Sequence, residues 1–216
     1  MQRLIVYLQI ILILALVGAV AAPRSPEIGA IGLKDWTKDE DLRHPYGIGF
    51  YLFQPVSDKV KLTFEYDYLT SKTRDWVYQY SGHSQLSGCS AMEEVVRRNR
   101  VSLFQFGFRH LVARSRTTSL DFGGGVCFAN VGAGEHSRQS GVHRDFANAY
   151  KMGLVIDVGL LVTELKDLPL VMRFGFRHRF LSGCGSARPC GWASSTFDDP
   201  ITTTGLSWGL GYQFGR

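Results

Sequence analysis

The sequence predicts an all-β protein, an eight-stranded antiparallel up-and-down transmembrane β-barrel. Three observations support this fold class. Short stretches alternate bulky apolar side chains with small or charged ones, the connections between them alternate between short and long, and the glycines gather on the charged face. Side chains of a strand point to opposite faces with period two, so each stretch predicts a strand with one apolar and one polar face. In a membrane barrel, the apolar face contacts lipid and the other face lines the lumen.

Seven strands show this alternation directly, and an eighth is inferred from topology. The seven cover residues 46–52, 59–70, 101–109, 120–128, 150–160, 170–179 and 202–214. A closed barrel with an even number of strands needs one more strand before residue 46, and residues 27–34 are the candidate. In the last strand Leu206, Trp208, Leu210, Tyr212 and Phe214 share one face.

The connections between the predicted strands fall into two classes that alternate along the chain. Short connections are expected at 54–58, 112–117 and 164–169, and long ones at 71–98, 132–148 and 181–200. Short turns on one rim and long loops on the other are typical of outer-membrane barrels, with the turns in the periplasm and the loops outside the cell.

The glycines indicate which face of the barrel points inward. Almost all strand glycines share the charged face, and Gly124 is the exception. The interior of an eight-stranded barrel is only just wide enough for side chains to fill, so small residues are expected there. The bulky face then points outward, and we expect Phe64, Phe106 and Trp208 to contact lipid.

The inner face carries acids and bases in close mixture. We expect them to form a network of ion pairs and hydrogen bonds that plugs the lumen in place of a hydrophobic core. The alternative is a charged pore. The residues are Lys61, Glu65, Asp67, Arg109, Asp121, Lys151, Asp157, Arg173, Arg177 and Arg179.

The first residues of the chain have the pattern of a secretory signal peptide. Arg3 precedes a long apolar run, and small residues end at Ala21, so we expect a signal peptide at 1–21 and a barrel domain at 22–216. The alternative is an uncleaved anchor, but Gln9 interrupts the apolar run. The formal net charge is +5. Export and the dispersed basic residues argue against a nucleic-acid partner.

The chain resembles the small outer-membrane barrels, a group that includes the OmpA transmembrane domain and the OmpX/Ail and OmpW-like proteins. The resemblance covers essentially the whole mature length and is most specific in the last strand, 202–214, which is similar to the C-terminal signal read by the barrel assembly machinery. It implies a monomer in the bacterial outer membrane, in contact with membrane lipid and lipopolysaccharide and inserted by that machinery.

Two histidines raise the question of catalysis. The segment Phe-Gly-Phe-Arg-His occurs at 106–110 and at 174–178. The two strands run in opposite directions, so the histidines should lie at opposite ends of the barrel, on the lipid-facing side. Small outer-membrane barrels include lipid A deacylases and a palmitoyltransferase with a Ser nucleophile and a His base. His178 and Ser182 are the corresponding candidates, although Ser182 is expected to enter a loop.

Cysteines and loop histidines are candidates for structural or metal sites. Cys184 and Cys190 lie close together in one outer loop, which predicts a local disulfide in an exported protein. Cys89 and Cys127 could form a second bridge or remain two thiols. Glu135, His136 and His143 share a predicted loop but match no ligand motif, and we expect neither a metal nor another cofactor.

The expected function is structural or based on surface interaction. The outer loops are rich in residues that contact proteins or sugars, so the candidate partner is an extracellular protein or glycan. These residues include Trp76, Tyr78, Tyr80, Arg97, Arg98 and Trp192. The alternatives are a narrow porin-like channel for small solutes and a lipid A-modifying acyl hydrolase or transferase.

Overall fold

The computed structural model describes residues 26–38, 42, 44–79, 91–137, 143–145, 149–163, 169–183 and 200–214. The predicted signal peptide, 1–21, lies outside the described residues. So do Cys89, Cys184, Cys190, Tyr80 and Trp192, and the predicted disulfide therefore stays a prediction.

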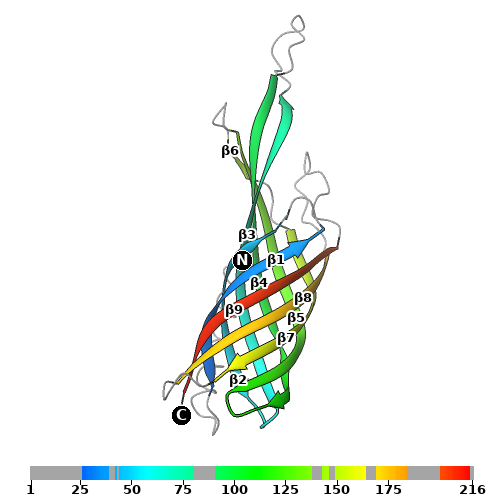
Figure 1. Ribbon diagram of the computed structural model, residues 1–216. Helices are drawn as coiled ribbons and strands as arrows, with labels where there is room; N and C mark the ends of the chain where they lie inside the picture. The colour runs from blue at the N-terminus through cyan, green and yellow to red at the C-terminus, as the bar shows by residue number, and fades with distance from the viewer. Residues whose placement is uncertain are drawn as a thin grey trace, which may run out of the picture.

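Eight antiparallel strands form a closed ring (Figure 1). Strands β1 to β5 pair in sequence order, β5 pairs with β7, β7 with β8 and β8 with β9, and the pairing of β9 with β1 closes the barrel. The one described strand outside this ring, β6, is short and pairs with β5 alone. The predicted all-β up-and-down barrel is confirmed. The strands are β1 (Glu27–Thr37), β2 (Tyr46–Pro55), β3 (Val60–Gln79), β4 (Ala91–Arg114), β5 (Thr118–Ser137), β6 (His143–Asp145), β7 (Ala149–Val162), β8 (Leu170–Gly183) and β9 (Ile201–Gln213).

The strand inferred only from topology is present as β1. It pairs with β2 from Glu27 to Lys34 and with β9 from Glu27 to Thr37. Because β1 joins the last strand to the second, it completes the barrel wall. The prediction of an eighth strand before residue 46 is confirmed.

Short connections lie at one rim of the barrel, which we call the turn rim. Ser57 and Ser115 stabilise two of them, since each side-chain oxygen accepts a hydrogen bond from the backbone N–H at the start of the next strand, Val60 and Thr118. The opposite rim, which carries the other connections, is called the loop rim. These local hydrogen bonds explain why such short segments reverse the chain.

The region expected to be a long loop at 71–98 is largely strand, so this expectation is wrong. Beyond the barrel wall, Ser71–Gln79 of β3 pairs with 91–99 of β4 and forms a ribbon that projects past the loop rim (Figure 1). The loop expected at 132–148 is also partly strand, because β5 continues to Ser137 and pairs with β6. Outside the membrane no hydrocarbon contacts the outward face, so the contrast between an apolar and a polar face that marks the lower strands is lost.

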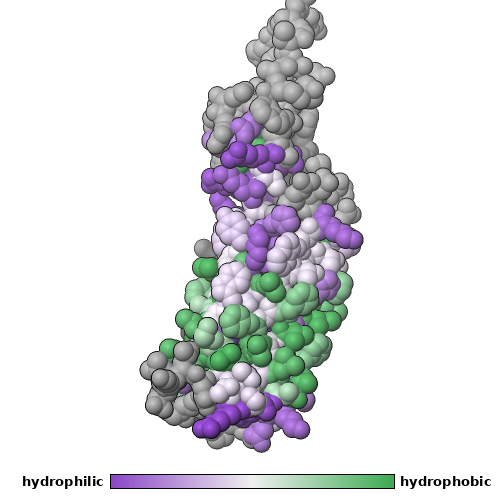
Figure 2. Space-filling view, viewed as in Figure 1, coloured by the Kyte–Doolittle hydropathy of each residue, from purple (hydrophilic) through white to green (hydrophobic). Residues whose placement is uncertain are grey.

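The outer surface of the barrel carries a belt of exposed apolar side chains (Figure 2). Its members include Ile48, Phe50, Phe106, Phe108, Leu154, Phe176, Trp208 and Leu210, each more than two-fifths exposed. Cross-strand aromatic pairs lie within the belt, such as Phe64 with Phe106, whose ring centres are 4.9 Å apart. A continuous apolar band of this kind is stable against hydrocarbon and not against water. The predicted outward direction of Phe64, Phe106 and Trp208 is confirmed.

No helix among the described residues is long and apolar enough to cross a membrane.

Candidate functional site

The lumen holds a network of charged side chains with equal numbers of each sign among the described residues. Six carboxylates, Glu27, Asp35, Glu65, Asp67, Asp121 and Asp157, face six cations, Lys61, Arg109, Lys151, Arg173, Arg177 and Arg179. All are buried except Lys61, whose side chain is 29% exposed. All ten residues predicted for the network therefore line the lumen. Glu27 and Asp35 were missed.

Asp67 lies at the centre of this network. It accepts hydrogen bonds from Arg177 (Nη1 to Oδ2, 2.9 Å), Arg179 (Nη2 to Oδ2, 2.5 Å) and Gln105 (Nε2 to Oδ2, 2.5 Å). Arg179 also donates to Asp35 of β1 at 2.5 Å. These contacts join β3, β4 and β8 to β1 across the barrel, so the side chains cross the lumen and hold opposite walls together.

A second group of ion pairs lies closer to the turn rim. Arg109 donates to Asp121 (Nη1 to Oδ1, 2.6 Å) and to Asp157. Arg177 donates to Glu65 and lies 3.6 Å from Asp157, and this pair connects the second group to the first. Charge-assisted contacts of this kind balance the loss of water around buried charges.

Arg173 lies below these pairs, where it donates to Asp121 (Nη2 to Oδ1, 3.3 Å) and lies over two aromatic rings. Its guanidinium carbon is 4.3 Å from the ring centre of Phe53 and 5.7 Å from that of Tyr51. Tyr51 in turn donates to Glu27 at 2.9 Å, and Glu27 pairs with Lys61 at 3.3 Å. Aromatic side chains thus supplement the carboxylate of Asp121 as partners for this cation.

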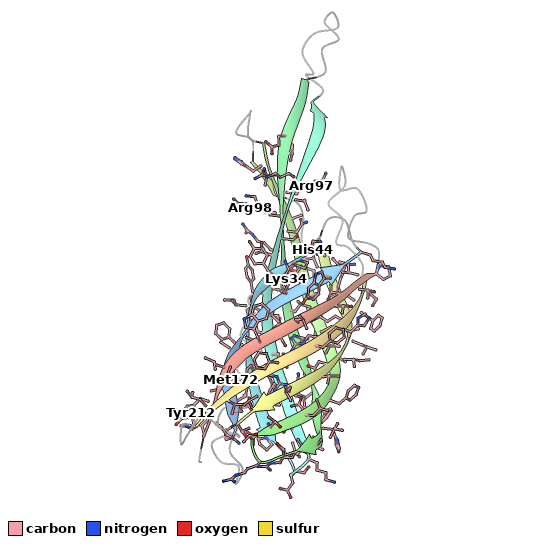
Figure 3. All side chains as sticks on the ribbon, in the orientation of Figure 1. Lys34, His44, Arg97, Arg98, Met172 and Tyr212 are labelled. Carbon is pink, nitrogen blue, oxygen red and sulfur yellow. The ribbon has the colours of Figure 1, made fainter. Side chains whose placement is uncertain are left out.

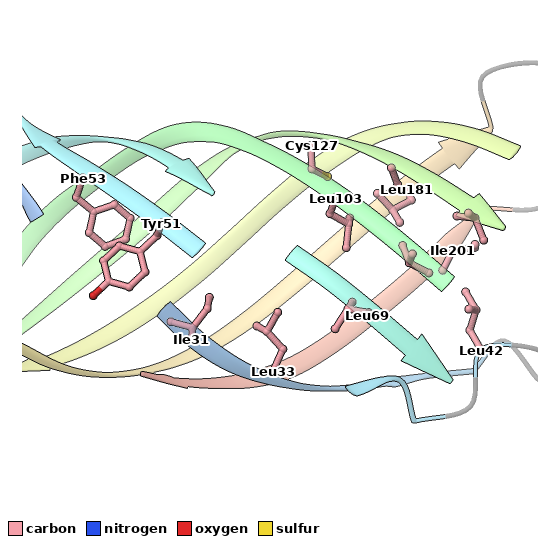
Figure 4. Close-up of a cluster of buried hydrophobic side chains, with 13 residues drawn as sticks. Ile31, Leu33, Leu42, Tyr51, Phe53, Leu69, Leu103, Cys127, Leu181 and Ile201 are labelled. Carbon is pink, nitrogen blue, oxygen red and sulfur yellow. The ribbon is translucent and has the colours of Figure 1, made fainter. Parts of the chain in front are cut away.

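Apolar side chains, which the alternation of the strands did not predict, fill the lumen towards the loop rim. We call the set the apolar layer: Ile31, Leu33, Leu42, Leu69, Val101, Leu103, Cys127, Ala129, Val131, Leu181 and Ile201. Figure 4 shows Leu42, Leu181 and Ile201 at one end of the cluster and Tyr51 and Phe53 at the other. Leu42 belongs to the connection between β1 and β2 and is only 2% exposed. The layer adds a hydrophobic section to an otherwise charged interior.

A small cavity lies beside Leu42. Its volume is about 10 Å³, and its lining includes Leu69, Leu103 and Arg179. A single water molecule needs at least this much space. The cavity is therefore no larger than one water molecule.

His178 and Ser182 do not form a nucleophile–base pair. His178 Nδ1 lies 2.7 Å from Thr204 Oγ1, whereas Ser182 Oγ donates to the backbone oxygen of Met152 at 3.0 Å. Both residues belong to β8, so the expectation that Ser182 enters a loop is wrong. Four residues along a strand span roughly 13 Å, far beyond the hydrogen-bond distance that a base needs to activate a serine.

The residues considered for a metal site lie in strands, and the loop expected for them is wrong. Glu135 and His136 belong to β5, and His136 pairs across the ladder with His143 of β6. The described part of the chain holds no group of three or more His, Cys, Asp or Glu residues placed to bind a metal ion.

Cys127 is a free thiol. It is completely buried in the apolar layer. The sequence left open whether Cys127 forms a disulfide with Cys89 or remains a thiol, and in the structure Cys127 is a thiol.

No protein-family model matches the chain. A search of curated proteins finds no match either. The chain is similar to solved outer-membrane barrels. A major outer membrane protein from Thermus thermophilus is 11% identical, with 88% of this chain and 99% of that chain covered and a TM-score of 0.48. Ail, the attachment invasion locus protein of Yersinia pestis, is 14% identical (88% and 97% covered, TM-score 0.46), and Neisserial surface protein A is 9% identical (89% and 98% covered, TM-score 0.40).

Proposed function

We propose that the protein is a resident of the bacterial outer membrane whose lumen is plugged and which acts through its outer surface. In this proposal a signal peptide is cleaved during export and the barrel assembly machinery inserts the chain as a monomer. The turn rim then lies in the periplasm and the loop rim outside the cell, as in other bacterial barrels. The apolar belt supports the membrane location.

The observation that carries the plugged lumen is the balanced network of buried charges. A pore that selects ions by charged side chains is lined by rings of one sign and needs space for the ions to pass. Here the described lumen residues include six carboxylates and six cations, so neither sign is in excess. Arg177 and Arg179 extend across the lumen to carboxylates of β1 and β3. The apolar layer adds further side chains that fill the lumen, with Leu42 and Ile201 at its end near the loop rim (Figure 4). Solute transport is therefore disfavoured.

The ribbon supports a role at the cell surface. It continues the β3–β4 ladder without interruption from the barrel wall to Gln79 and Ala91. Figure 3 shows Arg97 and Arg98 on this ribbon, beyond Lys34 and His44 at the loop rim. A rigid barrel that presents an ordered ribbon outside the membrane is suited to contact lipopolysaccharide, proteins or glycans.

Planar-bilayer recordings test the plugged lumen. The full-length protein, refolded in detergent, is added to a bilayer, and insertion is verified in parallel by its heat-dependent mobility on gels. We expect no steady single-channel steps, while a general porin treated in the same way gives them. Reproducible steps from the folded protein would contradict the proposal and favour the channel.

A further inference from the structure

Three cations lie together on the outward face of the ribbon base, and we call them the cationic patch: Lys72, Arg98 and Arg100. Lys72 is directly opposite Arg98 across the β3–β4 ladder, and Arg100 follows Arg98 on the same face. All three side chains are exposed. Like charges placed directly opposite each other destabilise an antiparallel pair. The arrangement is therefore costly unless an anion lies between them.

No acidic side chain of the described residues neutralises the cationic patch. Arg74, the next cation on this face, lies 4.0 Å from Glu94, whereas Lys72, Arg98 and Arg100 form no ion pair within the described part of the chain. Guanidinium groups donate two parallel hydrogen bonds and suit phosphate oxygens, and an ammonium group beside them adds a point charge. The patch thus has the chemistry of a phosphate site.

The position of the patch relative to the apolar belt indicates which phosphate it would meet. Thr70 and Arg100 are paired, and two residues further down the same face lie Tyr68 and Ser102, followed by Phe104. Tyr68 is 37% and Phe104 41% exposed. A ligand with a phosphate above hydrocarbon chains would match both parts at once.

We propose that the cationic patch binds a phosphate group of an outer-leaflet glycolipid, with the acyl chains of that lipid lying against Tyr68, Phe104 and the belt below. This inference rests on the outer-membrane location proposed above. Cations near an anionic lipid surface each strengthen binding, and their effect falls off within a Debye length, about 8 Å at physiological ionic strength. A soluble polyanion could bind the same three side chains but would not contact the apolar belt, so it is the competing ligand.

Lipid binding by the full-length refolded protein tests the proposal. Affinity is measured in detergent for diphosphoryl lipid A, for dephosphorylated lipid A with the same acyl chains, and for inositol hexakisphosphate as a soluble polyphosphate. The test variant is Lys72→Gln/Arg98→Gln/Arg100→Gln. The matched control, Lys59→Gln/Arg114→Gln/Arg116→Gln, removes three exposed cations at the turn rim. Heat-dependent gel mobility verifies that each variant is folded.

We expect the test variant to bind diphosphoryl lipid A roughly 100-fold more weakly than the native protein and to bind dephosphorylated lipid A equally well. The control should bind both lipids as the native protein does. Retained affinity in the test variant, an equal loss in the control, or equally tight binding of the soluble polyphosphate would each overturn the proposal. None of these outcomes alters the bilayer recordings, so a failed lipid site remains distinguishable from an open lumen.

Discussion

Gly205 lies directly across the β1–β9 ladder from Asp35, and the Oδ1 atom of Asp35 occupies the space where a side chain at position 205 would begin. The same relationship holds for three further cross-strand pairs: Gly49 with Asp67, Gly123 with Asp157, and Gly159 with Asp121. Each glycine lets the opposite carboxylate lie over the neighbouring strand and reach an arginine of another strand. The glycines on the charged face therefore position the network as well as relieve crowding.

This relationship predicts that Gly205→Ala destabilises the barrel. The new Cβ would overlap Asp35 and lie 2.9 Å from the backbone oxygen of Lys34, so the carboxylate must move away from Arg179. Overpacking of this kind costs about 1–3 kcal/mol in free energy of unfolding, measured by urea titration in lipid vesicles. The control is Gly124→Ala, where the nearest atom would be 3.5 Å away. Equal stability of the two variants would show that the carboxylate does not depend on the glycine.

Replacement of Arg177 tests the ion network itself. Arg177→Gln removes the hydrogen-bond partner of Glu65, which keeps only a longer ion pair with Arg109 (3.6 Å), and one of the partners of Asp67; both carboxylates are buried. An uncompensated buried charge costs about 3–5 kcal/mol in comparable cases. We expect the free energy of unfolding, measured by the same urea titration, to fall by this amount. Arg98→Gln, on the exposed ribbon, should change stability by less than about 0.5 kcal/mol.

The double variant Arg177→Gln/Glu65→Gln separates pairing from simple loss of packing. The second change removes one of the two carboxylates that lose a partner in Arg177→Gln. We therefore expect the double variant to lose less free energy of unfolding than the two single variants lose in sum. Strict additivity would mean that Arg177 and Glu65 do not interact in the folded barrel.

The strands and their faces could be predicted from the sequence because the membrane imposes the pattern. Hydrocarbon outside and charges inside give each wall strand a contrast with period two, and Trp208 and Gly209 illustrate it on β9. The ribbon at 71–79 was missed because its two faces do not differ in this way. Its existence depends on hydrogen bonds to β4, which a single strand does not reveal.

The interior was predicted in part for a related reason. Parity shows that Glu65 and Arg177 face the lumen, but not that they meet, because their heights depend on strand register. Asp35 was missed because the first strand was expected to end at residue 34. The apolar layer was missed although Leu33 and Leu103 share parity with the charged residues, since only the register places them together at one level of the barrel.

Cys127 provides a chemical test of access to the lumen. The thiol is fully buried in the apolar layer, so a water-soluble maleimide should not modify it while the barrel is folded. The experiment uses the protein with Cys89, Cys184 and Cys190 replaced by serine, so that one thiol remains. We expect labelling after unfolding in urea and almost none before, measured by mass spectrometry. Rapid labelling of the folded protein would indicate that water and small solutes enter this part of the lumen.

The direction of the apolar belt can be tested with two positions of nearly equal exposure. Leu154 lies in the belt on β7 and is 58% exposed, and Val56 lies in a connection at the turn rim and is 57% exposed. In water, arginine at either position would be tolerated equally. In a membrane, Leu154→Arg places a charge in hydrocarbon and should cost about 2–4 kcal/mol, while Val56→Arg should have almost no effect. The free energy of unfolding in lipid vesicles measures both, and equal values would mean that Leu154 does not contact lipid.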